Sequence, residues 1–318
     1  MHSLSIHDND TPKSKSPLSI YILSNSRSLY STRRLFEEAY KRGHKVKVYP
    51  PIDLSMLLSR RSLQLYFQRN QISAPDCIIP RLGMKKPGYT LSVIRQFEMM
   101  KVTTLNGSQA MGRSRDKLRA LQILSQHNIG IPKTFFLDSL SDIEIAIEHV
   151  GGAPVIIKVP EGSQGMGVIL AESVRSARSI LETLLSQGRH VLVQEFISES
   201  KGSDIRVIIL GGRVVAAMRR DSVADDFRAN LHRGGSQSGV ELSVEMHKTS
   251  QIAARALGLQ FAGVDMVQSA NGPLVLEVNS SPGLEGIEAA SGANIALACV
   301  NYLEKLHKLK DQRDSVGY

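Results

Sequence analysis

The sequence has 318 residues, an ordinary apolar content of 42% and a net charge of +9. A chain of this length predicts two or three domains with room for a sizeable core. No apolar run approaches the roughly 18 residues that a membrane span needs, and residues 1–17 are polar and serine-rich, without the apolar segment of a secretory signal. We therefore expect a cytoplasmic protein with no membrane partner, in which residues 1–17 form a disordered tail.

The two cysteines, Cys77 and Cys299, lie in the apolar stretches DCIIP and ALACV. In such surroundings a buried free thiol is more common than a disulfide or a nucleophile. We predict reduced cysteines in the core, in agreement with a cytoplasmic location.

Positive charge is concentrated in the amino-terminal third of the chain. Residues 1–120 carry a net charge of +13, and the remainder carries −4. A basic surface of this kind attracts nucleic acids, acidic peptides or anionic metabolites. Proteins that bind single-stranded nucleic acids usually stack bases on aromatic side chains, and this chain has no tryptophan and only 5% aromatic residues. An acidic protein or a small anion is therefore the favoured partner, and direct binding of nucleic acid is not expected.

The first part of the chain predicts a βαβ opening. Residues 19–24 and 45–49 have the composition of strands, and between them residues 32–42 form a predicted helix that ends at Gly43. No G-x-G-x-x-G motif follows the first strand, so this part is not a dinucleotide site. Residues 60–70 are basic with scattered apolar residues, a pattern that favours a solvated amphipathic surface.

A buried strand is predicted at residues 77–80, and it ends at Arg81. Open α/β sheets place ligands at the carboxyl edge of their strands, so Arg81 either holds an anion there or is an ordinary surface arginine. A further short strand ends at Asn106, and we place the domain boundary near residues 105–115.

The next helix is predicted to begin near Arg115 and to stop at Gly130. Its first turn contains Lys117, and a lysine at this place opposes the helix dipole. Contact with a phosphate would account for such a position.

A glycine-rich loop follows in the second part of the chain. The apolar strand VIIK ends with Lys158, and a loop containing Gly162, Gly165 and Gly167 leads to a second strand, VILA. Because a strand rather than a helix follows, the loop is neither a Walker P-loop nor a Rossmann fingerprint. It suits a β-hairpin lid that closes over phosphates, with the lysine as a point charge. An ordinary glycine-rich turn is the alternative.

Polar residues also interrupt the next two predicted strands. VLVQEFI carries Gln194 and Glu195, which could meet the adenine and ribose of a nucleotide. In SDIRVIIL, Asp204 and Arg206 alternate onto one face. The first of these strands follows a predicted helix at residues 173–187.

Residues 226–235 form a polar, basic loop that is too long for a minimal connection. Its His232 has no Ser or Cys nucleophile nearby, so a catalytic triad is not expected. Further helices are predicted at residues 244–257 and 294–309.

Residues 262–283 predict a β-hairpin, because two apolar runs flank a turn with an Asn-Gly pair. With the ladder centred near residues 270 and 271, Asp265 pairs with Glu277, and Asn279 lies two residues further along the same face. Three oxygen-bearing side chains then converge.

The same register puts Val267 and Val275 on this face, which would keep bulk water out. Two carboxylates there repel each other by roughly 4 kcal/mol at about 4 Å and an effective dielectric near 20, so a cation is expected between them. Asp, Glu and an amide form a hard ligand set suited to magnesium that keeps open positions for phosphate oxygens. The alternative is a hairpin whose polar face meets solvent.

Taken together, these motifs resemble the ATP-grasp superfamily and, more closely, its RimK-type glutamate ligases. The similarity runs from about residue 18 to residue 305, and several separate stretches agree in order: IIPRLG, NGSQAMGRSRDKLRALQIL, GGAPVIIKVPEGSQGMGVILAES, VLVQEFI, DIRVIILGGRVVAAMRR, DFRANLHRGG, AGVDMV and LVLEVNSSPGLEGIE.

The resemblance implies an α/β and α+β architecture, namely the ATP-grasp fold with an amino-terminal, Rossmann-like pre-ATP-grasp domain. The expected domains are residues 18–110 and residues 111–318. Within the second, the resemblance implies a lid subdomain at about residues 130–197 and a carboxy-terminal subdomain at about residues 198–305.

The resemblance also implies roles for individual residues. Two magnesium or manganese ions would be held by Asp265, Glu277 and Asn279. Separately from the resemblance, we expect the catalytic arginines near the transferred phosphoryl group to be Arg206 and Arg228, because phosphoryl transfer depends on charge neutralisation. The residues expected to bind ATP are Lys117, Lys158, Gly162, Gly165, Gly167, Gln194, Glu195, Phe196, Asp204, Arg228, Ala229 and Asn230.

The implied activity is ATP-dependent ligation of a carboxylate and an amine. ATP converts the carboxylate into an acyl phosphate, and the amine of L-glutamate displaces phosphate to form a peptide bond. The implied acceptor is the carboxyl terminus of a small-subunit ribosomal protein, whose acidic tail would suit the basic amino-terminal third. The resemblance further implies a homo-oligomer, a tetramer.

Two alternatives are distinct from this hypothesis. The first keeps the chemistry but uses a small-molecule or coenzyme carboxylate. The second is a ribosome-binding protein that binds a nucleotide without catalysis, and the complete set of metal ligands argues against it. Release of ADP that depends on glutamate would separate an enzyme from a binding protein.

Overall fold

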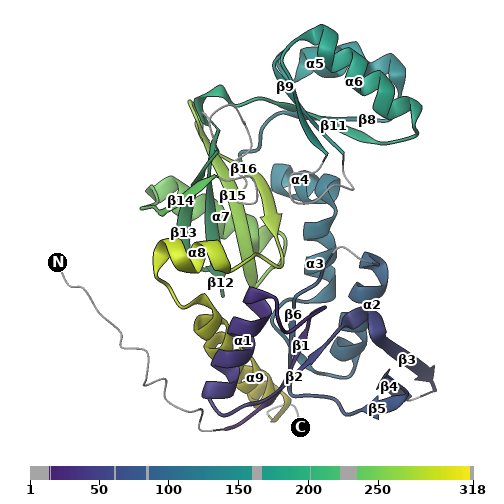
Figure 1. The fold of residues 1–318 in the computed structure, drawn as a ribbon, viewed down its shortest axis with the longest axis vertical. Helices are drawn as coiled ribbons and strands as arrows, with labels where there is room; N and C mark the ends of the chain where they lie inside the picture. The colour runs from purple at the N-terminus through teal and green to yellow at the C-terminus, as the bar shows by residue number, and fades with distance from the viewer. Residues whose placement is uncertain are drawn as a thin grey trace, which may run out of the picture. The chain divides into compact units, whose positions relative to one another are not determined.

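The structure is a computed structural model that describes residues 14, 16–60, 62–83, 86–159, 167–200, 202–222 and 235–315 (Figure 1). The chain divides into two compact units. The first contains residues 1–108 and 294–318, and the second contains residues 109–293. Each unit has its own sheets.

The first unit is built on a parallel sheet with the strand order β2-β1-β6-β7. Strands β1 and β6 are in the middle of the sheet and almost wholly buried, as their unbroken apolar sequences require. This arrangement confirms the predicted βαβ opening. The strands are β1 (Ser19–Leu23), β2 (Lys45–Tyr49), β6 (Cys77–Pro80) and β7 (Thr103–Thr104), and the helices are α1 (Tyr30–Lys41), α2 (Pro87–Met99) and α9 (Ile295–Ser315).

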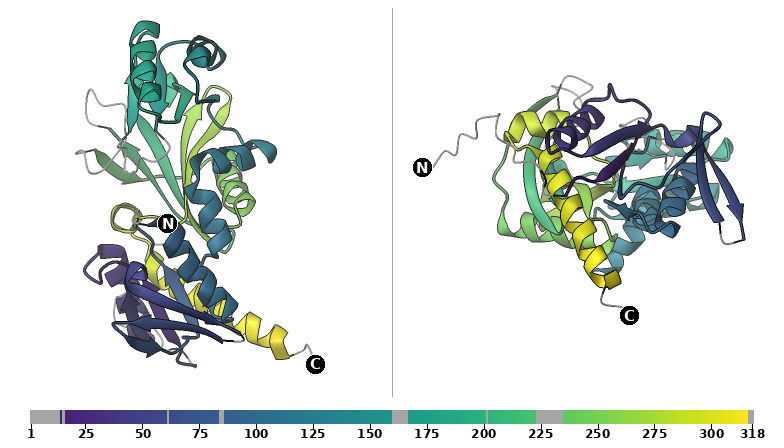
Figure 2. Two further views of the ribbon diagram at one scale, coloured as in Figure 1. Left: turned by 90° about the vertical axis from the view of Figure 1, so that its right-hand side faces the viewer. Right: turned by 90° about the horizontal axis from the view of Figure 1, so that it is seen from below.

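Helix α9 ends the chain but packs beside α1 of the first unit (Figures 1 and 2). Arg42, just after α1, donates two hydrogen bonds of 2.7 and 2.8 Å to Glu304 of α9. Arg34 of α1 donates a third, of 3.0 Å, to Asn294. The sequence interpretation groups this helix with the preceding domain, whereas its contacts group it with the amino-terminal unit.

A second sheet of the first unit is antiparallel and contains β3 (Leu54–Ser59), β4 (Ser62–Phe67) and β5 (Asn70–Ile72). The prediction of a solvated amphipathic surface for residues 60–70 was wrong, because β4 is the central strand and its Leu65 is fully buried. Leu63, Leu65 and Phe67 alternate along β4 and pair with apolar residues of β3, which is the pattern of a strand.

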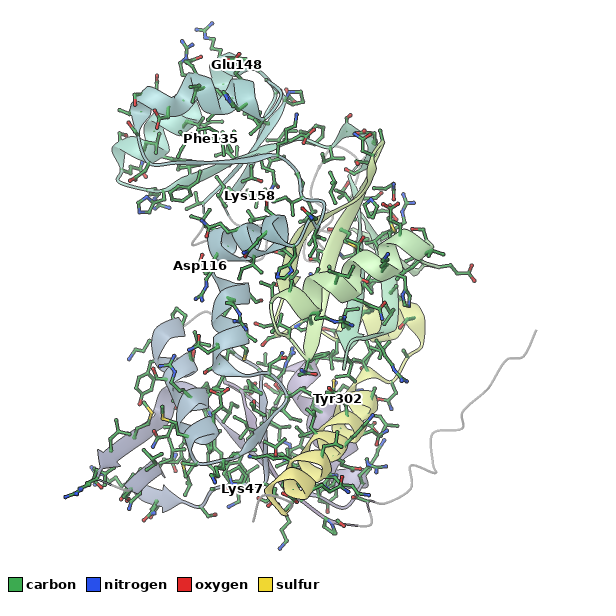
Figure 3. The ribbon with its side chains drawn as sticks, turned by 180° about the vertical axis from the view of Figure 1, so that it is seen from behind. Lys47, Asp116, Phe135, Glu148, Lys158 and Tyr302 are labelled. Carbon is green, nitrogen blue, oxygen red and sulfur yellow. The ribbon has the colours of Figure 1, made fainter. Side chains whose placement is uncertain are left out.

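The second unit contains a four-stranded antiparallel sheet with the order β10-β9-β11-β8. Helices cover one face, and alternate strand residues such as Ile157 pack against them. Figure 3 shows Phe135 on this helix-covered face and Lys158 on the opposite face. The elements are β8 (Thr134–Leu137), α5 (Ile143–His149), β9 (Val155–Lys158), β10 (Val168–Ala171), α6 (Val174–Ser186) and β11 (Val191–Glu195).

The other sheet of the second unit has five antiparallel strands in the order β14-β13-β12-β15-β16. Its apolar face packs against two helices, α4 and α7, in one core. The elements are α3 (Ser108–Arg115), α4 (Lys117–Gln126), β12 (Ser203–Leu210), β13 (Arg213–Asp221), β14 (Ser236–Gly239), α7 (Val244–Ala256), β15 (Phe261–Ser269), β16 (Gly272–Asn279) and α8 (Glu285–Ser291).

The helix predicted from Arg115 onward is α4, and a separate helix, α3, precedes it. Asp116 stands between the two, and its side chain accepts a hydrogen bond of 3.0 Å from the backbone N–H of Arg119. An aspartate at this position caps a helix and separates it from the preceding turn. The cap places Lys117 at the first position of α4.

Cys77 and Cys299 are buried and free, as predicted. Burial raises the pKa of the Cys77 thiol to about 12, so this sulfur remains protonated and inert at neutral pH. In the described part of the chain, no helix is long and apolar enough to span a membrane.

Candidate functional site

A cavity of about 190 Å³ lies in the second unit, with walls from both of its sheets. Motifs that are far apart in the sequence meet here. The predicted site residues that line the cavity are Lys158, Gln194, Glu195, Phe196, Asp204, Asp265 and Glu277.

The hairpin of β15 and β16 supplies the acidic wall of this cavity. Asp265 pairs with Glu277, and Gly263 pairs with Asn279, as the sequence predicts. Asp265 is only 2% exposed, whereas Glu277 is exposed. The two carboxylates therefore face each other from a buried and an open position.

A β-bulge at Leu276 changes the register nearer the turn, where Met266 pairs with Val275. The prediction that Val275 shares a face with Asp265 was therefore wrong. Val275 lies with Met266 in the apolar core, and Leu276 lines the cavity together with Val267. Because side chains alternate along a strand, one inserted residue moves its neighbours to the other face, and an apolar pattern alone does not reveal it.

Two arginines hold Asp265. Arg206 is its partner on β12 and donates from Nε to Oδ1 at 2.7 Å and from Nη2 to Oδ2 at 2.6 Å. Nη2 of Arg220 lies 3.0 Å from the same Oδ2. Burial alone would raise the pKa of the Asp265 carboxyl, but the two arginines hold it well below its usual range. Asp265 is thus an anion at neutral pH.

Arg220 joins Asp265 to a second carboxylate, that of Asp204. Asp204 and Arg220 pair across β12 and β13, and Arg220 donates two hydrogen bonds of 2.6 Å to the carboxylate. Burial raises the pKa of Asp204 to about 6, with Arg220 opposing the shift and Asp265 adding to it. Sequence reasoning assigned no role to Arg220. The Gly-Gly turn before β13 and the alternation of the strand opposite Asp204 are the signals that could have found it.

Lys158 stands on the opposite wall, on the cavity face of β9. Its Nζ donates to Oε1 of Gln194 at 2.6 Å, and Nε2 of Gln194 donates to Oγ1 of Thr134 at 2.8 Å. Burial lowers the pKa of Lys158 to about 8, with Glu277 opposing the shift and Lys117 adding to it. A desolvated ammonium fixed by an amide is well placed to bind an anion.

Other described residues that the sequence predicts to bind the nucleotide lie near the same wall. Lys117 donates from Nζ to the carbonyl of Val159 at 3.3 Å, and burial lowers its pKa while Glu277 opposes the shift. Glu195 accepts a hydrogen bond of 3.1 Å from the backbone N–H of Lys133. The carbonyl of Gly167 accepts from the backbone N–H of Val159 at 2.9 Å, which extends the ladder between β9 and β10.

The acidic side chains fit a magnesium ion. Oδ2 of Asp265 accepts from both arginines, and Oδ1 accepts from Nε of Arg206. Nδ2 of Asn279 donates to Oε1 of Glu277 at 2.9 Å, which leaves the amide oxygen as an acceptor. Two carboxylates and an amide oxygen are the hard donors that magnesium prefers.

Part of the predicted site lies outside the described residues, namely Gly162, Gly165, Arg228, Ala229 and Asn230. The structure therefore brings together the predicted metal ligands, the two lysines and the polar end of β11.

Two protein-family models match the chain. The RimK PreATP-grasp domain matches residues 18–111, and the RimK-like ATP-grasp domain matches residues 114–303.

Curated relatives cover almost the same range. The protein of Aliivibrio salmonicida named "Probable alpha-L-glutamate ligase" is 48% identical over 288 residues, which are 91% of this chain and 96% of that protein. A protein of Rhodopirellula baltica with the same name is 51% identical over 286 residues, which are 90% of this chain and 71% of that protein.

Solved structures share the fold at low sequence identity. The ATP-grasp ligase PsnB, complexed with a minimal precursor, superposes with a TM-score of 0.72 at 20% identity and covers 91% of this chain and 99% of its own. D-alanine–D-alanine ligase from Bacillus anthracis, complexed with ATP, gives a TM-score of 0.67 at 18% identity and covers 94% and 99%. By its family models and its relatives, this chain belongs to the RimK-like ATP-grasp family, and it is an ATP-dependent ligase.

Proposed function

We propose that this ligase joins the amine of L-glutamate to a carboxylate that it first activates with ATP. The name shared by its curated relatives supports glutamate as the amine substrate. The observation that carries the proposal is the pairing of Asp265 with Glu277 at the wall of a cavity that also contains Lys158. Facing carboxylates and a desolvated lysine are what a nucleoside triphosphate and its cation require.

ATP occupies the cavity in this proposal. Lys158 and Lys117 contact the phosphates, and the stretch from Gln194 to Phe196 holds the adenine and ribose. Lys158 suits this role because its amine is already desolvated and is oriented by the amide of Gln194. Asp204 completes the nucleotide site.

Asp265, Glu277 and Asn279 would hold magnesium. When bound, the ion would neutralise charge on the β- and γ-phosphates. Manganese accepts the same oxygen ligands and is the alternative metal.

The reaction has two steps. A carboxylate oxygen of the acceptor attacks the γ-phosphorus, the bond to the β–γ bridging oxygen breaks, and ADP leaves. The neutral amine of glutamate then attacks the acyl carbon, phosphate leaves with the acyl oxygen, and the nitrogen loses a proton. Both steps depend on positioning and charge neutralisation, for which Arg206 and Arg228 are the proposed catalytic residues.

We further propose that the acceptor is the carboxyl terminus of a protein, and specifically of a small-subunit ribosomal protein. The similar ligase PsnB has been solved in complex with a minimal precursor and with a precursor peptide, which supports a peptide substrate. The net charge of +13 on residues 1–120 also favours an acidic tail.

A defined peptide tests the proposal. The protein is incubated with ATP, magnesium, L-glutamate and a synthetic peptide that ends in glutamates with a free carboxyl terminus, and products are identified by mass spectrometry. We expect additions of whole glutamyl residues and matching ADP release, and neither with the carboxamide form of the peptide. In a parallel reaction, a cell lysate replaces the peptide. Additions found only on small metabolites of the lysate would exclude the protein acceptor.

A further inference from the structure

Arg81 stands at the place where open α/β sheets bind their ligands. In the sheet of the first unit, β1 has β2 on one side and β6 on the other. The chain therefore leaves β1 in one direction and later returns to its other side, which makes the gap between β1 and β6 a topological switch point. Ligands of such sheets bind outside the carboxyl ends of the strands at this point. Arg81 is the first residue after β6.

The backbone around Arg81 is fixed by its neighbours. Its N–H donates to the carbonyl of Leu23, the last residue of β1, at 2.8 Å. The loops that follow the two strands also touch, because Nδ2 of Asn25 lies 3.0 Å from the place that a Cβ on Gly83 would occupy. The carboxyl ends of β1 and β6 are thus joined by a backbone hydrogen bond, and Arg81 directly follows one of them.

The guanidinium of Arg81 lacks an anionic partner among the described residues. Its Nη1 is buried and makes no hydrogen bond. Burial lowers its pKa to about 10, and the thiol of Cys299 is the neighbour that opposes this shift. Arg206 and Arg220 of the second unit, which are also buried, each bind a carboxylate through two hydrogen bonds. A buried guanidinium nitrogen without a hydrogen-bond partner costs stability, and an anion bound at Arg81 would supply that partner.

We propose that Arg81 binds a carboxylate group of a substrate at the carboxyl ends of β1 and β6. A planar guanidinium matches the two oxygens of a carboxylate, and a single cation suits one negative charge better than a polyphosphate. The proposal rests on the function proposed above, because both substrates of that reaction carry carboxylates. Arg81 remains charged at neutral pH and so retains its affinity for an anion.

The alternative is that Arg81 only supports the fold. The two possibilities predict opposite effects on stability. If the arginine serves a ligand, Arg81→Met removes an unsatisfied cation and leaves the protein at least as stable as the wild type in denaturant. If the arginine is structural, the same substitution destabilises the protein.

Steady-state kinetics of Arg81→Met, Arg81→Lys and the matched control Arg95→Met test the proposal. Arg95 is an exposed arginine on α2 of the same unit. For Arg81→Met we expect the KM of one carboxylate substrate to rise at least about tenfold, with the KM for ATP and the stability retained. Arg81→Lys should lie in between, and Arg95→Met should match the wild type. The substrate whose KM rises, either L-glutamate or the peptide, identifies the source of the carboxylate.

Direct binding separates this proposal from the proposed reaction. Calorimetry with L-glutamate and with the free and carboxamide forms of the peptide needs no turnover. Binding of a free carboxylate by the wild type that is lost in Arg81→Met supports the site even if no ligation occurs. Equal binding by both proteins, unchanged KM values, or unfolding of Arg81→Met would overturn it.

Discussion

Arg206 binds the carboxylate of Asp265 through two hydrogen bonds, of 2.7 and 2.6 Å. The side chain proposed as the central metal ligand is thus already oriented by a cation. The same contact fixes Arg206, the proposed catalytic arginine, next to the proposed metal ligand.

This contact predicts that Arg206→Lys lowers kcat by about 10²-fold or more, because a lysine cannot form the two parallel hydrogen bonds. The measurement is steady-state ADP release with saturating substrates. Arg219→Lys is the matched control, since Arg219 is 52% exposed on the neighbouring strand. Equal kcat values for the wild type and Arg206→Lys would remove Arg206 from the catalytic machinery.

Arg220 is predicted to stabilise the fold as well as the site. In Arg220→Met, the carboxylates of Asp204 and Asp265 lose a shared cation that is only 8% exposed. Removing one partner of a buried ion pair lowers the free energy of unfolding by about 3–5 kcal/mol. Denaturant titration measures this loss. Arg219→Met should cost less than about 1 kcal/mol, because its pair with Asp221 is exposed. A similar, small loss in both variants would show that the buried network contributes little.

The metal site is predicted to depend on both facing carboxylates. Asp265→Asn and Glu277→Gln each replace a charged oxygen donor with a neutral amide, so the magnesium concentration for half-maximal ADP release should rise at least about tenfold. Chelation of the metal should abolish activity in the wild type. Asp221→Asn, on the rim of β13, serves as the control. An unchanged magnesium dependence in Asp265→Asn would place the ion elsewhere.

Lys158 is predicted to couple ATP binding to proton uptake. In the free protein it is charged below a pH of about 8 and neutral above, because burial lowers its pKa from 10.5. Phosphates favour the charged form and raise this pKa in the ATP complex. At a pH between the pKa values of the free and the ATP-bound protein, ATP binding therefore takes up a proton, and it weakens as the pH rises. Below about pH 7 the proton is already present and uptake disappears.

Calorimetry of ATP binding at pH 9, in two buffers that differ in ionisation enthalpy, measures this uptake. Lys158→Arg, which stays charged throughout, should bind ATP without it. Equal proton uptake by the two proteins would assign the proton to another group.

The sequence predicted those parts of the fold that local patterns encode. The pairing of Asp265 with Glu277 follows from a two-residue turn and a period of two, and the structure confirms it. The bulge at Leu276 was missed, because an inserted residue leaves the apolar pattern plausible in either register. Strand β4 was missed although Leu63, Leu65 and Phe67 alternate, because the basic residues on either side drew attention to the charge of the stretch.

The charge network around Asp265 shows where sequence reasoning ends. Asp204 and Arg206 were recognised as members of one strand face, but their partners depend on which strands become neighbours. Arg220 binds both Asp204 and Asp265 only because β13 pairs with β12 and β12 pairs with β15. Tertiary pairing of this kind is not encoded by any single stretch of the chain.

The transfer of oxygen from the acceptor to phosphate tests the proposed reaction most directly. A peptide ending in glutamate, with its terminal carboxyl labelled with ¹⁸O, is incubated with the protein, ATP, magnesium and L-glutamate, and the released phosphate is analysed by mass spectrometry. Activation as an acyl phosphate predicts that the first peptide bond formed on each peptide transfers one ¹⁸O atom to phosphate. Phosphate without the label, released while the first glutamate is added to the peptide, would contradict an acyl-phosphate mechanism.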